Sequence, residues 1–208
     1  MTEMICAGAG LAAGIVLGRK QLRRWKIANK RNQALLTIGT IIVFLAGGYL
    51  MKLYGYHILK IIRYWGLMYA LLLLALLDSE KKVIPNRALL VLLGIRTVLM
   101  VGECICFPQL CMEIVMSAAL GMAGGGLLFL LAGLLAGRGI GMGDVKLIGI
   151  MGYFAGFQVL MSDLIITLTL TVLAGLTALV LKKASLRSEL PFAPFAAVGT
   201  MITILMGF

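Results

Sequence analysis

Charged residues are scarce in this chain of 208 residues: they make up 13% of the sequence, against 62% apolar residues. A soluble domain of this size carries about 25% charged and about 45–50% apolar residues. The polar residues are too few to cover a water-soluble globule, which excludes a cytosolic enzyme, a disordered protein and a secreted disulfide scaffold. Because a helix needs about 20 apolar residues to cross a bilayer, we expect an all-α, polytopic transmembrane helical bundle of about eight helices.

Metal ligands are equally scarce, since the chain has one histidine, His57, and four cysteines that form no CxxC pair. This pattern argues against a zinc site, and we expect no metal and no other cofactor. Three cysteines lie near one predicted loop: Cys104, Cys106 and Cys111. We interpret them as small apolar residues near helix ends, with a disulfide among them as the alternative.

Acidic residues number eight against 19 Lys and Arg, which gives a net charge of +11. In a membrane protein the positive-inside rule explains such an excess, so we expect cytoplasmic loops and no nucleic-acid partner. Fifteen of the 19 cations fall in alternate loops, at residues 19–31, 81–87, 138–146 and 182–187. This bias predicts that both ends of the chain lie outside the cytoplasm, and that residues 19–31 contact lipid headgroups. Three cations of a predicted outer turn go against the rule: Lys52, Lys60 and Arg63.

Apolar runs separated by polar, proline-containing or glycine-rich stretches predict the helices. We expect them at about residues 4–18, 34–51, 61–77, 87–101, 110–136, 144–158 and 160–181, and from 191 to the end. The third helix is expected to stop at Asp78. Residues 1–60 form an N-terminal pair of helices with a basic cytoplasmic loop in this interpretation, and residues 61–208 form the helical core.

Two of the eight acids, Asp78 and Asp144, end or begin an apolar helix at the predicted cytoplasmic boundary. Charge at membrane depth costs about 2.5–3.5 kcal/mol or more, so an acid held there is a candidate functional residue. The structural alternatives are a water-exposed helix end for Asp78 and an N-cap for Asp144. Glu113 is expected to reach the outer face. The other five acids are expected to be solvated in loops or tails: Glu3, Glu80, Glu103, Asp163 and Glu189.

The surroundings of Asp144 favour a functional role, because glycine recurs at every second position from Gly137 to Gly143. Glycine permits positive φ and close approach of another chain. A nucleotide-binding GxGxG would need a strand before it and a helix after it, and no such βαβ unit fits here. We therefore expect a pliable loop that leaves space for an extended peptide beside Asp144, with Lys146 close by.

Gly141-Met-Gly143-Asp144 resembles the GxGD signature of type IV prepilin peptidases, a family of intramembrane aspartyl proteases. Asp78 with the downstream Ile84-Pro85-Asn86 resembles the family's first catalytic aspartate and its I-P-[DN] motif. Gly152 falls where the family keeps small residues, and Pro191-Phe-Ala-Pro194-Phe resembles its late P-F-x-P-F segment. The order and spacing match from about residue 65 to the end.

The resemblance implies an Asp78/Asp144 catalytic dyad that needs no metal, with substrate-binding or loop-shaping roles around it. Residues expected in those roles are Gly141, Gly143, Lys146, Pro85, Asn86, Pro191 and Pro194. The implied substrates are prepilins and pseudopilins, whose short basic leader is removed at the cytoplasmic face of a prokaryotic inner membrane. Association with pilus or secretion machinery is a further expected partnership.

The loop at residues 19–33 lacks the two CxxC pairs of the larger, bifunctional family members. The resemblance is therefore to the compact enzymes of Flp/Tad-type pilus systems, and we expect peptidase activity without N-methylation. Two other functions stay open from the residues alone. One is a small transporter or channel with functional intramembrane acids, although no inverted repeat is visible. The other is an inactive scaffold subunit of a pilus or secretion machine.

Overall fold

A computed structural model describes residues 2–136, 141–181 and 191–207. Within these ranges the protein consists of α-helices and one short 3-10 helix, with no strand, so the all-α prediction is confirmed. The helices are α1 (Thr2–Arg24), α2 (Lys30–Tyr54), α3 (Ile58–Lys81), α4 (Asn86–Cys106), η1 (Pro108–Leu110), α5 (Cys111–Ala136), α6 (Met142–Ala155), α7 (Phe157–Val180) and α8 (Ala193–Leu205).

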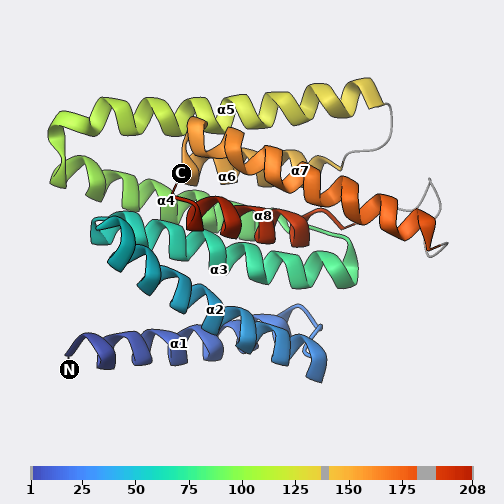
Figure 1. Cartoon of the computed structure of the whole chain (residues 1–208), viewed down its shortest axis with the longest axis horizontal. Coiled ribbons are helices and arrows are strands. Elements are labelled where there is room, and N and C mark those ends of the chain that lie inside the picture. Colours follow the sequence, from blue (N-terminus) through green and yellow to red (C-terminus); the bar gives the residue numbers. More distant parts are fainter. Residues whose placement is uncertain (1, 137–140, 182–190, 208) are drawn as a thin grey trace.

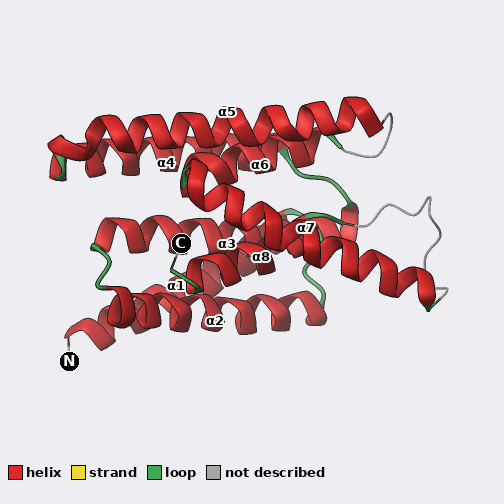
Figure 2. Ribbon diagram, turned by 45° about the horizontal axis from the view of Figure 1, so that its top comes forward, coloured by secondary structure: helices red, strands yellow, loops and turns green. Residues whose placement is uncertain are grey.

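The helices run up and down along one common direction. Figures 1 and 2 show α1 and α2 on one side of α3, α5 on the opposite side of the bundle, and α6 and α8 between them. The α1–α2 turn, the α3–α4 connection and the N-termini of α6 and α8 lie at one end, on the right in Figure 1. We call this the aspartate end, because it carries both Asp78 and Asp144.

Four of the described helices are long and apolar enough to cross a membrane: α3, α4, α5 together with η1, and α7. The chain is therefore a multi-pass membrane protein. The sixth helix lies close to its expected range, 144–158, and the eighth is shorter than expected: α6 has 14 residues and α8 has 13. At 1.5 Å per residue these helices are about 20 Å long, short of the roughly 30 Å hydrocarbon core.

Several predicted helix ends are also corrected. The basic segment at residues 19–31 is largely helical, since α1 continues to Arg24 and α2 begins at Lys30. Helix α3 does not stop at Asp78 but ends at Lys81, where Lys82 adopts a left-handed conformation with φ of 50°. Helix α4 extends to Cys106 and so includes Glu103. The glycine-rich residues 137–140 and the basic residues 182–190 lie outside the described ranges.

Helix α6 occupies the centre of the bundle, with nine of its 14 residues buried. Its glycines explain how it fits there, because a Cβ at Gly152 would lie 2.2 Å from the Gly121 carbonyl oxygen of α5. Small residues allow such close backbone approach between membrane helices. The helix ends at Gly156, whose φ of 87° turns the chain sharply into α7.

The N-terminal helices pack on the rest of the chain through a small cluster of their own. Leu22 of α1 and Leu36 of α2 are fully buried against Leu76 and Leu77 of α3. The division of the chain at residue 60 stays a prediction.

Candidate active site

Asp78 lies in the last turns of α3, and only 5% of its surface is exposed. Its Oδ2 accepts a hydrogen bond from the Ala193 backbone amide at 3.0 Å. The C-terminus of a helix disfavours a negative charge, whereas the free amides at a helix N-terminus favour one. The start of α8 therefore compensates the unfavourable position of Asp78 at the end of α3. A water-exposed helix end, the structural alternative for Asp78, is excluded by this burial.

Asp144 lies in the first turn of α6, at the aspartate end and outside the four membrane-crossing helices. Gly141 is the N-cap of this helix, so Asp144 is not the N-cap residue but the third residue of the helix. Its carboxylate accepts a hydrogen bond from the Gly141 backbone amide. This is the reciprocal side of a capping box, in which an acid at the third position reaches back to the first amide.

The two carboxylates interact electrostatically. Burial, followed by the charge of Asp78, raises the pKa of Asp144 to about 6, against a smaller lowering by the Gly141 amide. A like charge acts this way only at short range, because it disfavours ionisation of its neighbour. The structure therefore brings together two acids that are separated by more than sixty residues in the sequence.

The Ile84-Pro85-Asn86 segment leads from α3 into α4 and contacts the first turns of α6. Ile84 is buried, and its Cβ lies 3.3 Å from the position that a Cβ on Gly143 would occupy. Pro85 is the N-cap of α4, and the Asn86 side chain accepts a hydrogen bond from Lys146 Nζ at 3.0 Å. Gly143 thus allows the first turn of α6 to pack directly on the α3–α4 connection. Lys146 faces Asn86, on the exposed side of α6.

The Pro191-Phe-Ala-Pro194 segment explains how α8 reaches Asp78. Phe192 precedes the helix, is buried, and packs on Phe129 of α5 with ring centroids 5.6 Å apart. Pro194 occupies the first turn of α8, where a backbone N–H would have no intrahelical acceptor, so proline costs no hydrogen bond there. The amide of the intervening Ala193 is then free to bind Asp78. The sequence motif signalled this segment, but the amide donor itself was not predicted.

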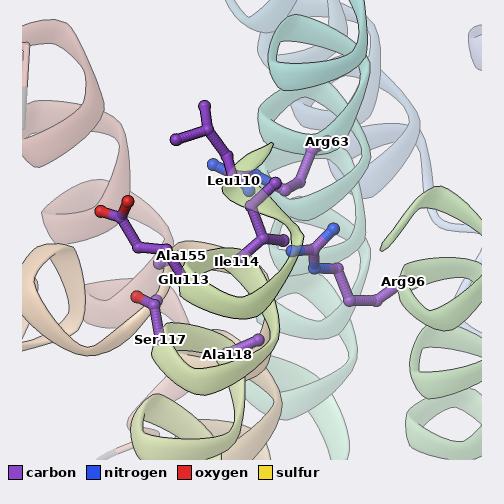
Figure 3. A pocket seen from close by; sticks show the side chains of 9 residues that line it. Arg63, Arg96, Leu110, Glu113, Ile114, Ser117, Ala118 and Ala155 are labelled. Carbon is purple, nitrogen blue, oxygen red and sulfur yellow. The ribbon is translucent and has the colours of Figure 1, made fainter. Parts of the chain in front are cut away.

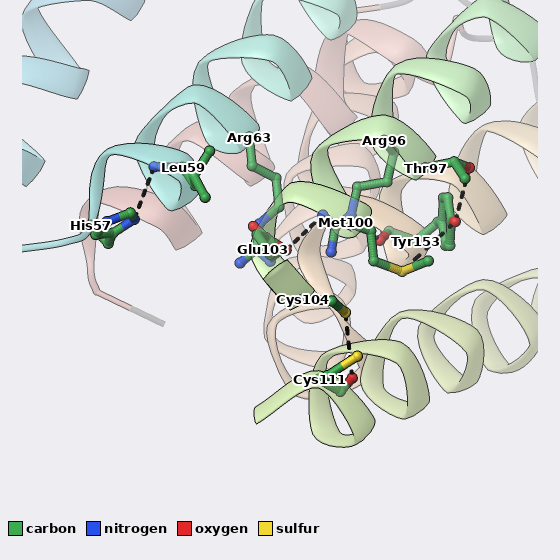
Figure 4. A network of polar contacts seen from close by, with 10 residues as sticks. All are labelled: His57, Leu59, Arg63, Arg96, Thr97, Met100, Glu103, Cys104, Cys111 and Tyr153. Carbon is green, nitrogen blue, oxygen red and sulfur yellow. Dashed lines mark hydrogen bonds and ion pairs between the residues drawn. The ribbon is translucent and has the colours of Figure 1, made fainter. Parts of the chain in front are cut away.

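Two further buried acids contradict the expectation that they are solvated in loops. Asp163 of α7 is 1% exposed and accepts hydrogen bonds from Thr167 at 2.9 Å and from Thr200 of α8 at 2.7 Å. Glu103 of α4 is 5% exposed and binds Arg96 at 2.8 Å and Arg63 at 3.3 Å, as Figure 4 shows. No hydropathy pattern reveals such pairs, because their partners lie on other helices or one to two turns away.

The other sequence-predicted features have plain structural roles. His57 caps α3 by accepting a hydrogen bond from the Leu59 amide. Cys104, Cys106 and Cys111 are free thiols, so the disulfide alternative is wrong. Among the described residues, no group of three or more His, Cys, Asp or Glu side chains is arranged to hold a metal ion.

Known proteins resemble this chain in sequence. A sequence model of the type IV leader peptidase family matches residues 65–181, a range that contains Asp78, Asp144 and the Ile84-Pro85-Asn86 segment. A prepilin leader peptidase/N-methyltransferase of Pseudomonas putida is 30% identical over 145 residues, covering 68% of this chain and 48% of that protein. A protein of the same name from Bacillus subtilis is 27% identical over 137 residues, covering 66% of this chain and 52% of that protein.

The chain spans about half the length of the curated relatives it matches. No solved structure matches it significantly. The family match covers more than half of the chain and includes both aspartates at the aspartate end of the bundle. The chain therefore belongs to the type IV leader peptidase family.

Proposed function

We propose that the chain is an intramembrane aspartyl endopeptidase that removes the basic leader from prepilin-like proteins, with Asp78 and Asp144 as its catalytic pair. The observation that carries this proposal is the electrostatic coupling of two acids from separate helices at one end of a membrane bundle. Perturbed acids with a specific charge partner are typical of catalytic sites.

The chemistry follows from one proton shared by two carboxyl groups. The ionised carboxylate takes a proton from water as the water oxygen attacks the carbonyl carbon of the scissile amide. The protonated carboxyl gives its proton to the carbonyl oxygen, which forms a tetrahedral intermediate. The intermediate collapses when the C–N bond breaks: the leaving nitrogen takes a proton from one carboxyl group, and a hydroxyl of the intermediate gives its proton to the other carboxylate, so that the pair again holds one proton. The titration belongs to the pair, so neither role is assigned to one aspartate.

The surrounding residues hold this pair in place. The Ala193 amide orients Asp78, and the Gly141 amide orients Asp144. Ile84 and the Lys146–Asn86 hydrogen bond fix α6 relative to the α3–α4 connection. Gly141, Gly143, Pro85, Asn86, Lys146, Pro191 and Pro194 are in this proposal the residues that shape the site and its substrate path.

The substrate and its orientation follow from charge. The basic loops predict that the aspartate end faces the cytoplasm of a prokaryotic inner membrane. A prepilin whose apolar helix lies in the bilayer would present the junction between leader and helix at this depth. Its basic leader would stay in the cytoplasm, close to the two acids.

The test is cleavage of a co-expressed prepilin by the wild type, Asp78→Asn and Asp144→Asn, with equal protein abundance verified in the membrane fraction. We expect each substitution to reduce cleavage by a factor of at least about 10²–10⁴, because each removes one proton-transfer group. Glu80→Gln is the matched control, since it neutralises an acid of the same end that pairs with the exposed Arg31. Retained cleavage in either aspartate variant would reject the dyad.

A further inference from the structure

The end of the bundle opposite Asp78 and Asp144 contains an open cavity of about 200 Å³ between α3, α4, α5 and the start of α7. Figure 3 shows its polar lining, in which the guanidinium groups of Arg63 and Arg96 lie near each other. Arg63 lies 15 residues before Asp78 on α3, so the cavity is about 22 Å from the catalytic pair along that helix. Arg63 and Arg96 have no role in the proposed proteolysis and belong to none of the motifs described above.

On one side of this cavity, positive charges outnumber negative ones. Arg63 and Arg96 share a single carboxylate, Glu103. Arg96 is 1% exposed, and its Nε donates to the Tyr153 carbonyl oxygen at 3.0 Å. Arg63 Nε is buried and has no hydrogen-bond partner among the described residues. Two cations that share one carboxylate leave a net positive charge here, and a buried N–H donor without an acceptor is costly, which makes this a candidate ligand site.

Two helix N-termini add to the positive potential here. Glu113 and Ile114 of the first turn of α5 line the cavity, as do Leu110, which directly precedes α5, and Gly156, the N-cap of α7. Helix N-termini attract anions because the first backbone amides have no intrahelical acceptor and the helix dipole places partial positive charge there. A group carrying one negative charge therefore fits between the two arginines.

The other side of the cavity carries the opposite charge. Glu113 lines it with an exposed side chain, and Figure 3 shows its carboxylate turned away from the two guanidinium groups. Leu110 and Ile114 supply apolar surface beside it. The cavity thus offers cations, an anion and apolar contacts together. A volume of about 200 Å³ has room for a hydrated headgroup, since one water occupies roughly 30 Å³.

We propose that this cavity binds a phospholipid headgroup that carries both a phosphate and a primary ammonium group, as phosphatidylethanolamine does. Arg63 and Arg96 bind the phosphate, Glu113 binds the ammonium group, and Leu110 and Ile114 contact the glycerol and acyl region. The free headgroup, phosphoethanolamine, has the same charges but lacks the acyl chains, so the apolar lining favours the lipid as the source.

The test is native mass spectrometry of the full chain, delipidated in detergent and mixed with equal amounts of phosphatidylethanolamine, phosphatidylglycerol or phosphatidylcholine. We expect one phosphatidylethanolamine molecule to bind about tenfold more tightly than the choline lipid, whose quaternary ammonium donates no N–H hydrogen bond to Glu113. Arg63→Gln should weaken binding of every lipid about tenfold. Glu113→Gln should abolish the preference for ethanolamine over glycerol by weakening the first lipid and strengthening the second.

The matched control is Glu80→Gln, which makes the same chemical change as Glu113→Gln in an ion pair at the aspartate end. It should leave lipid binding unchanged. Equal binding of the ethanolamine and choline lipids would overturn the proposal, as would a Glu113→Gln variant that keeps the wild-type preference. Displacement of the lipid by equimolar phosphoethanolamine would also overturn it, because the ligand would then be a soluble headgroup. Folding of each variant is verified by its thermal unfolding temperature.

Discussion

The contact between α5 and α6 predicts opposite effects for the same substitution at two positions of α5. A Cβ on Gly121 would lie 2.3 Å from the carbonyl oxygen of Gly152 and 2.9 Å from its carbonyl carbon. Ordinary contact begins at 3.4 Å, so Gly121→Ala forces the two backbones apart by about 1 Å. A Cβ on Gly126 meets nothing within 4 Å.

The expected cost of Gly121→Ala is about 1–3 kcal/mol in the free energy of unfolding, because backbone atoms cannot rotate out of the way. Gly126→Ala should instead be neutral or stabilise the protein by up to about 1 kcal/mol, the difference in helix propensity between the two residues. Thermal unfolding of both variants in the same detergent measures the difference. Because α6 carries Asp144, Gly121→Ala should also reduce prepilin cleavage. Equal unfolding temperatures for the two variants would refute the close α5–α6 contact.

Three other predictions concern the rest of the molecule. Gly143→Val should reduce cleavage about tenfold or more, because the new side chain pushes α6 away from Ile84. Gly94→Val is the control, since a Cβ at Gly94 meets nothing within 4 Å. Equal cleavage rates for the two variants would contradict this packing. Glu103→Gln should lower the free energy of unfolding by about 3–5 kcal/mol, because it leaves two arginines without their carboxylate partner. Glu80→Gln, in the more exposed pair with Arg31, should lower it by less than about 1 kcal/mol. Similar shifts in the thermal unfolding temperature of the two variants would count against the buried network. The pilin product should carry an unmethylated amino terminus, and a mass increase of one methyl group in the wild-type product would show that this prediction is wrong.

The sequence predicted those parts of the site that depend on local chemistry. Each aspartate borders an apolar run, and hydropathy alone places both at the same end once the helices alternate. The glycines before Asp144, together with Pro85 and Pro194, mark chain turns and helix starts. Such features depend on residues that are neighbours in the sequence, so they can be predicted from it. The all-α membrane bundle follows from composition, because too few polar residues are present for any other class.

The contacts that orient the aspartates could not be predicted in this way. The Ala193 amide binds Asp78 across 115 residues, and a backbone donor leaves no trace in side-chain composition. The predicted end of α6, at about residue 158, was too late because the apolar run continues past Gly156, whose positive φ ends the helix at Ala155. Glu103 was assigned to a loop because an isolated acid near a glycine lowers hydropathy, whereas its two arginine partners keep it buried within α4.

A pH titration of the aspartate carboxyl groups by NMR, in the wild type and in Asp78→Asn, measures directly whether the two acids share one site. The wild-type pKa of Asp144 is raised to about 6 by burial and by the charge of Asp78. Asparagine keeps the shape of residue 78 but removes that charge. The pKa of Asp144 should therefore fall toward its ordinary value without reaching it, because burial remains, and Glu80→Gln should leave it unchanged. An Asp144 pKa that is the same in Asp78→Asn as in the wild type would contradict the pairing of the two aspartates.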